Sequence, residues 1–187
     1  TRNALAVATM IGMHDVPIAA GCSRPLIEEI KVAADIHGET GLDGVVLPEP
    51  TVALEKSHAV DLIIDLIMTH PANTITLVPT GALTNIAMAV RKEPKIVERV
   101  KEVVLMGGGY HEANASAVAE FNIKFDPEAA KIVFNAGWDV TMVGLDLTHQ
   151  ALATPDIVEQ IEGIHTETSQ FVIDLLAFFR DMYKKGQ

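Results

Sequence analysis

Cysteine, aromatic residues and long apolar runs are all scarce in this chain of 187 residues. With Cys22 as the single cysteine, no disulfide can form within the chain, and we expect a reducing, cytoplasmic environment. No apolar run reaches the roughly 18 residues that a membrane-spanning helix requires. We therefore expect a soluble protein that has no membrane partner.

Basic residues are also few. The chain has 14 Lys and Arg residues against 25 Asp and Glu residues, and its net charge is −11. Sequence-independent binding to nucleic acid requires a basic surface that displaces counterions, so we exclude nucleic acid as a partner. An aromatic content of 5% also argues against a surface on which single-stranded bases stack.

What the chain does contain is apolar residues, which make up 49% of it and suffice for one packed domain over residues 1–187. Helical spacing predicts helices over residues 1–13, 58–70, 83–91 and 168–183, and shorter ones over 26–34 and 94–99. β-Branched or apolar runs predict strands over residues 16–20, 74–78, 103–106 and 139–143. Glycine and proline predict a loop over residues 35–50.

Helices alternate with these strands, so the strands must be joined by crossover connections and be parallel. We predict a doubly wound α/β domain, in which a mostly parallel sheet is covered by helices on both faces. Asp126, followed by Pro127 and Glu128, has the features of a helix N-cap, and we interpret it as a cap rather than a catalytic residue.

The region most suggestive of a binding site is the stretch from Lys101 to Asn122. Its strand, expected to be buried on both faces, runs into three consecutive glycines and then into the polar residues Asn114, Glu120 and Asn122. Ligands of open α/β sheets bind beyond the carboxyl ends of the strands, where such residues would lie. On local pattern alone, this stretch favours a glycine-rich connection without a ligand over a binding site.

Several known motifs are missing. No Gly-x-Gly-x-x-Gly fingerprint follows a strand, which disfavours a dehydrogenase cofactor domain, and the sequence has neither a P-loop nor a Gly-x-Ser-x-Gly elbow.

Six segments, in this order along the chain, closely resemble the inosine-uridine-preferring branch of the nucleoside hydrolases. They are Ile36–Glu39, Val78–Asn85, Val104–Gly109, Ala119–Asn122, Asp126–Ala130 and Val143–Thr148. The similarity extends over essentially all 187 residues, which makes it far more specific than any single motif.

The resemblance implies a Ca²⁺-dependent enzyme of purine or pyrimidine salvage that hydrolyses the N-glycosidic bond of ribonucleosides by a metal-bound water. Thr80 would donate its main-chain carbonyl oxygen to Ca²⁺. The expected substrate-binding residues are Asn114, Glu120, Asn122, Met106, Phe121 and His37. If the segment around Glu120 is extended, the side chains of Glu120 and Asn122 would point the same way and that of Phe121 the other.

The chain also departs from the family pattern. The aspartate-rich opening, which supplies the general base and most metal ligands, does not occur here, and neither does the later His-Asp pair that supplies a leaving-group acid. We therefore expect no catalytic residue within this segment. We also expect a family domain that lacks its N-terminal strand and its C-terminal part.

Two functions remain open at this point. The first is a nucleoside hydrolase, represented here by its central portion and, as the family implies, a homodimer or homotetramer. The second is a non-catalytic protein of the same fold that binds ribose or nucleosides.

Overall fold

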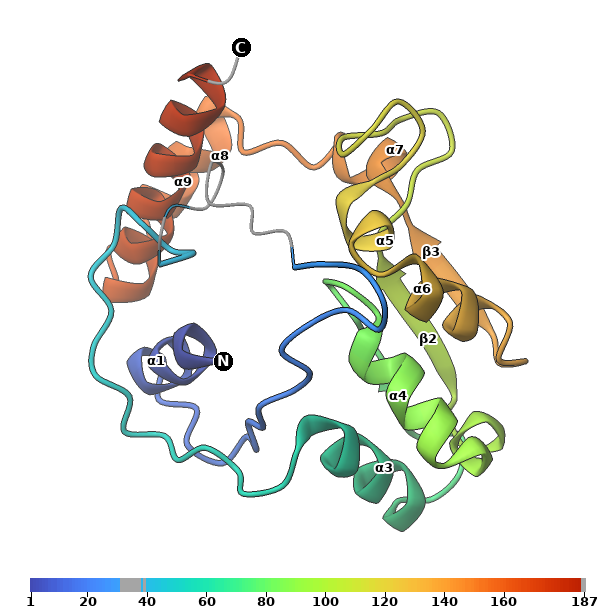
Figure 1. Cartoon of the computed structure of the whole chain (residues 1–187). Helices are drawn as coiled ribbons and strands as arrows, with labels where there is room; N and C mark the ends of the chain where they lie inside the picture. Colours follow the sequence, from blue (N-terminus) through green and yellow to red (C-terminus); the bar gives the residue numbers. More distant parts are fainter. Residues whose placement is uncertain (31–37, 39, 186–187) are drawn as a thin grey trace. The chain divides into compact units, whose positions relative to one another are not determined.

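The computed structural model describes residues 1–30, 38 and 40–185, with side chains described up to residue 181. The chain divides into two compact units (Figure 1). The first is assigned Thr1–Ile18, Val32–Glu55 and Leu152–Gln187, and the second Ala19–Lys31 and Lys56–Ala151. The single domain over residues 1–187 that the sequence predicted stays a prediction.

The second unit contains a three-stranded parallel sheet in the order β1-β2-β3. Its elements in chain order are α3 (Ala59–Thr69), β1 (Thr76–Leu77), α4 (Thr84–Lys92), η1 (Pro94–Glu98), β2 (Glu102–Met106), α5 (Phe121–Phe125), α6 (Pro127–Phe134), β3 (Val140–Val143) and α7 (Leu145–Thr148). Helical segments connect each strand to the next. The predicted parallel α/β class is confirmed.

The core of this unit lies between the sheet and the helices α4 and α6. Val103 and Leu105 of β2 are fully buried there. Small residues on the helices, among them Ala87 and Ala129, have no exposed surface and allow the helices to approach the sheet closely.

The two faces of β2 differ in burial, whereas the sequence predicted a strand buried on both. Val104 is half-buried, and its register partner Thr141 on β3 is exposed. Right-handed crossovers between strands taken in chain order place their helices on the same face. In agreement, α4 and α6 contact each other on one side of the sheet (Figure 1).

Two of the predicted elements are wrong or incomplete. The strand expected over residues 16–20 is only an isolated bridge between Ile18 and Leu54, and Val16 is 44% exposed. Pro17 lacks the N–H that a longer ladder would require. Residues 26–30 of the expected 26–34 helix are not helical, and residues 31–34 lie outside the described part. The described part of the 35–50 segment is a loop, as predicted.

The first unit is mainly helical. It contains α1 (Arg2–Met10), α8 (Pro155–Glu162) and α9 (Glu167–Lys185), and α8 packs against α9. The hydroxyl of Thr9 accepts hydrogen bonds from the backbone N–H groups of Thr51 and Val52, which fixes the loop beside α1. Throughout the described residues, no helix is both long enough and apolar enough to cross a bilayer.

Candidate functional site

The connections that follow the three strands lie side by side at the carboxyl edge of the sheet. The N–H of Met106 donates to the carbonyl of Pro79 at 2.9 Å, which joins the ends of β1 and β2. The N–H of Leu145 donates to the carbonyl of Gly108 at 2.9 Å, which joins the turns after β2 and β3. A Cβ at Gly144 would lie 3.1 Å from the oxygen of Gly108, so this close approach favours glycine.

The side chain of Asn122 bridges two of these connections. Its Nδ2 donates to the carbonyl oxygen of Met106 at 3.1 Å and to that of Thr80 at 3.4 Å. The same nitrogen lies 3.2 Å from the sulfur of Met106. The structure therefore brings together three residues that the sequence predicted for one site, from positions 80, 106 and 122.

Glu120 is buried, with 3% of its surface exposed, and its carboxylate accepts three backbone hydrogen bonds. Oε1 accepts from Asn122 at 2.8 Å, and Oε2 accepts from Gly108 at 2.9 Å and from Ile123 at 3.1 Å. Glu120 is thereby the N-cap of α5 and holds the glycine turn after β2.

The expected geometry of Glu120 and Asn122 is wrong. Glu120 has extended backbone angles, but Phe121 and Asn122 already belong to α5, so the alternation of an extended stretch does not apply. The physical reason is the cap itself, because the Glu120 carboxylate satisfies N–H groups that the first helical turn leaves without partners.

Two further substrate-binding candidates, Asn114 and Phe121, take no part in the bridge that Asn122 forms to Thr80 and Met106. Asn114 Oδ1 accepts a hydrogen bond from the N–H of Phe121 at 2.8 Å, so Asn114 also fixes the start of α5. The Phe121 ring lies against that of Phe125, with centroids 5.9 Å apart. His37 lies outside the described residues.

Asp146 is a polar residue at this edge to which the sequence reading gave no role. Its carboxylate accepts from the N–H groups of Tyr110 at 2.6 Å and of His111 at 3.0 Å, and it contacts His111 Nδ1 at 3.1 Å. The two backbone donors hold the pKa of Asp146 below its ordinary value. Two sequence signals could have indicated it: its position two residues after Gly144 at the end of a strand, and its place within the family-like segment Val143–Thr148.

These residues do not make a calcium site by themselves. Calcium takes six to eight oxygen ligands, and the only predicted ligand here is the Thr80 carbonyl. Within the described part of the chain, no three His, Cys, Asp or Glu side chains gather so that they could hold a metal ion.

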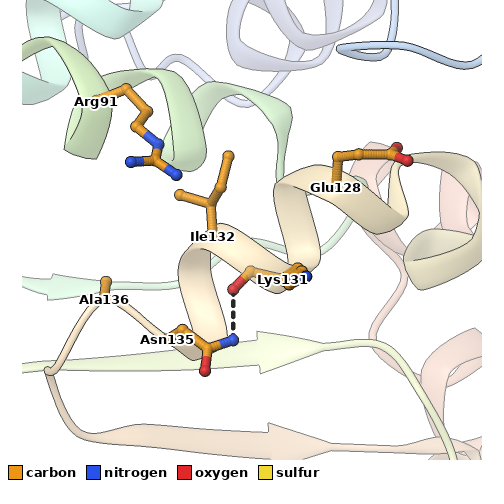
Figure 2. Close-up of a pocket in the computed structure, with 6 residues that line it drawn as sticks. All are labelled: Arg91, Glu128, Lys131, Ile132, Asn135 and Ala136. Carbon is orange, nitrogen blue, oxygen red and sulfur yellow. Dashed lines mark hydrogen bonds between the residues drawn. The ribbon is translucent and has the colours of Figure 1, made fainter.

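A separate pocket of about 570 Å³ opens between α4 and α6 (Figure 2). Arg91 and Ile132 line it, and Asn135 there donates to the carbonyl of Lys131 at 2.7 Å. Arg91 and Asn135 lie at the C-terminal ends of their helices, which in a crossover run back toward the amino edge of the sheet. This pocket therefore does not belong to the cluster at the carboxyl edge.

A pocket of about 480 Å³ lies beside the start of α4, lined by residues that include Cys22, His58 and Thr84. Burial is the main cause that raises the pKa of the Cys22 thiol. A raised pKa disfavours the thiolate, so the pair of Cys22 and His58 does not suit nucleophilic catalysis.

Comparison with known proteins bears on the function of the carboxyl-edge cluster. Residues 1–187 match the family described as inosine-uridine preferring nucleoside hydrolase. The chain is 57% identical to the protein of that name from Crithidia fasciculata, over 100% of the chain and 60% of the relative. It is 59% identical to the Leishmania major protein of the same name, over 99% of the chain and 59% of the relative.

Among solved structures, the fold matches a purine-preferring ribonucleoside hydrolase from Gardnerella vaginalis with a TM-score of 0.92 and 36% identity. That match covers 99% of this chain and 60% of the other. The chain thus spans about 60% of the length of these relatives. Its sequence and fold agree on one conclusion, that the chain belongs to the inosine-uridine preferring nucleoside hydrolase family.

Proposed function

We propose that the protein to which this chain belongs hydrolyses the N-glycosidic bond of ribonucleosides and releases ribose and free base. The observation that carries this proposal is the bridge from Asn122 Nδ2 to the carbonyl oxygens of Thr80 and Met106. It gathers polar groups at the carboxyl edge of a parallel sheet, where α/β proteins bind their ligands. Membership of a hydrolase family supports the same conclusion.

The role of this segment is to hold the sugar. Within the described residues, Asn122 Oδ1 and Asn114 Nδ2 have no hydrogen-bond partner, while the other amide atom of each side chain is engaged. Each is oriented by a bond to the protein and has one polar atom left for a ribose hydroxyl. Oriented groups of this kind lower the entropic cost of reaching the transition state.

Glu120 can contribute in a more limited way. A carboxylate has about four acceptor positions, and three are taken by backbone N–H groups. Oε1 accepts only one of these bonds, so we assign it the remaining acceptor position toward a sugar hydroxyl. Met106 and Phe121 would line the sugar, and His37 would lie near the bound nucleoside.

Calcium dependence remains part of this proposal, with the Thr80 carbonyl as one ligand. A bound metal ion lowers the pKa of a coordinated water. Because the described residues supply no further ligand, we assign no reaction step to the ion here. We place the general base, the leaving-group acid and the other ligands outside these 187 residues, and expect this segment alone to be inactive.

The proposed contacts are made to ribose, so we expect them to act on nucleosides of either base class. The relatives differ in the base preference that their names state, inosine-uridine in two and purine in the third. We also propose a cytoplasmic location and a homodimer or homotetramer, which sedimentation of the full-length protein would establish.

The test is ribose release by the full-length protein from inosine and from uridine, measured as reducing sugar. We expect turnover of at least one of them and its loss after calcium is chelated. The alternative, a non-catalytic binding protein, predicts saturable nucleoside binding by calorimetry without release of ribose. That result, or neither binding nor turnover, would contradict the proposal.

A further inference from the structure

Asp126 does more than cap a helix. Its Oδ1 accepts from the N–H of Ala129 at 3.0 Å, which is the N-cap bond that the sequence predicted for α6. Its Oδ2 accepts from the hydroxyl of Thr84 at 2.6 Å and from the N–H of Leu26 at 3.0 Å. Asp126 has no exposed surface, so its carboxylate joins three segments distant in sequence inside the core.

Two of these segments also carry the candidate site. Thr80 precedes Thr84 by four residues at the start of α4, and Asn122 precedes Asp126 by four residues along α5. The two segments are linked twice, by the Thr80–Asn122 hydrogen bond of 3.4 Å at the surface and by the Thr84–Asp126 hydrogen bond of 2.6 Å in the core.

The buried link is the stronger of the two. A hydrogen bond to a carboxylate is about twice as strong as one between neutral groups, and exclusion of water strengthens it further. The outer link is long and joins an exposed residue, so it restrains the spacing less. β1 is only two residues long, and the bond from the Met106 N–H to the Pro79 carbonyl at 2.9 Å extends its pairing with β2 as far as Pro79. The Thr84–Asp126 bond holds the Thr80 segment on its other side.

We propose that Asp126 is a positioning residue for the candidate site, because its bond to Thr84 fixes where the Thr80 carbonyl lies relative to the Asn122 side chain. Asp126 does not contact the substrate in this scheme. The bond to Leu26 adds a third segment, which is also held to α4 by the Cys22 N–H and Asn85 Oδ1 at 2.8 Å.

Thr84→Val is the variant that isolates this link. Valine keeps the branched shape of threonine in a site that is 6% exposed but removes the hydroxyl, and it leaves the bonds from Leu26 and Ala129 to Asp126 in place. Thr84→Ser restores a hydroxyl. Ser169→Ala is the matched control, since it removes a buried hydroxyl, bonded to the Thr166 carbonyl, in the other unit.

The kinetic part of the test rests on the proposed nucleoside hydrolysis and uses the full-length protein. We expect Thr84→Val to lower kcat by about tenfold for inosine and uridine alike, since small displacements of positioned groups reduce rates strongly. Thr84→Ser and Ser169→Ala should stay within about twofold of the wild type. A Thr84→Val protein whose melting temperature falls, as we expect for Ser169→Ala, but whose kcat stays at the wild-type value would overturn the inference.

The structural part does not depend on activity. Crystal structures of the full-length wild type and Thr84→Val should show a wider separation between Thr80 O and Asn122 Nδ2 in the variant. An unchanged separation would also overturn the inference. If the wild type releases no ribose from any nucleoside, the proposed function fails, and the two structures alone decide the role of Asp126.

Discussion

The backbone N–H of Gly108 donates a hydrogen bond of 2.9 Å to Oε2 of Glu120, which fastens the turn after β2 to the start of α5. Gly108 has a φ of +72°, a conformation that residues with a Cβ rarely adopt. The turn therefore presents its N–H to Glu120 in a conformation that favours glycine. A residue predicted to bind substrate is at the same time the anchor of the loop that forms the site.

Glu120→Ala should destabilise the full-length protein as well as reduce its activity. It leaves three backbone N–H groups without an acceptor, and each unsatisfied buried donor costs about 1–3 kcal/mol. Since such losses are not additive, we expect about 2–5 kcal/mol in total from urea unfolding. Glu120→Gln, which keeps one acceptor oxygen, should fall between Ala and wild type. The exposed change Glu112→Gln is the control, and equal stability of Glu120→Ala and wild type would refute this role.

The elements that the sequence predicted well are those with local signals. The run from Val103 to Met106 is β2 with one added residue, and the Asp126-Pro127-Glu128 sequence begins α6 at the predicted position. The cap of the first helical turn is a contact between near neighbours in the chain, and the β-branched run of β2 is a local composition that suits a strand.

What could not be predicted depends on distant partners. The run over residues 16–20 has the composition of a strand, but a strand forms only where another can pair with it, and one bridge is all that forms. Likewise, the partners of Asp126 at Thr84 and Leu26 lie 42 and 100 residues away, and no local pattern indicates them. The N-cap at Glu120 was missed because spacing alone does not distinguish an extended segment from a helix start.

Asp146 should titrate at a lower pH than an ordinary aspartate. Its folded-state pKa is lowered, mainly by the N–H groups of Tyr110 and His111, so its stabilising contribution is present above the unfolded pKa and is lost as the pH falls through the folded pKa. Those two amide protons report the change directly by NMR. We expect a midpoint below the ordinary value of 3.8 and no such transition in Asp146→Asn. A midpoint at or above 3.8 would contradict this prediction.

The 187-residue segment, expressed alone, should bind Ca²⁺ weakly and release no ribose. The described residues contain no group of three His, Cys, Asp or Glu side chains that could hold a metal ion, and calcium requires several anionic oxygens at one point. Calorimetric titration of the segment and of the full-length protein with Ca²⁺ makes the comparison. Tight binding by the segment, or calcium-dependent turnover, would show that ligands within it have been overlooked.

The same segment should also be poorly folded by itself. Thr141 and Val104 leave one face of the sheet incompletely covered, and parallel sheets are ordinarily buried on both faces. We expect a broad thermal transition and a weak near-UV circular dichroism signal. A sharp, cooperative melt with a strong near-UV signal would contradict this expectation.

Asn122→Ala in the full-length protein should lower kcat/KM for inosine and uridine to a similar extent. The change removes the bridge to the carbonyls of Thr80 and Met106 together with the proposed sugar contact. Leaving a buried partner group unsatisfied costs about 1–3 kcal/mol, which corresponds to roughly five- to a hundred-fold in rate if the contact acts at the transition state. Asn135→Ala is the matched control, because that amide also donates to a backbone carbonyl, at the end of α6, but lies outside the site. Steady-state kinetics on both substrates decides the matter: a loss confined to one base would place Asn122 beside the base rather than the ribose.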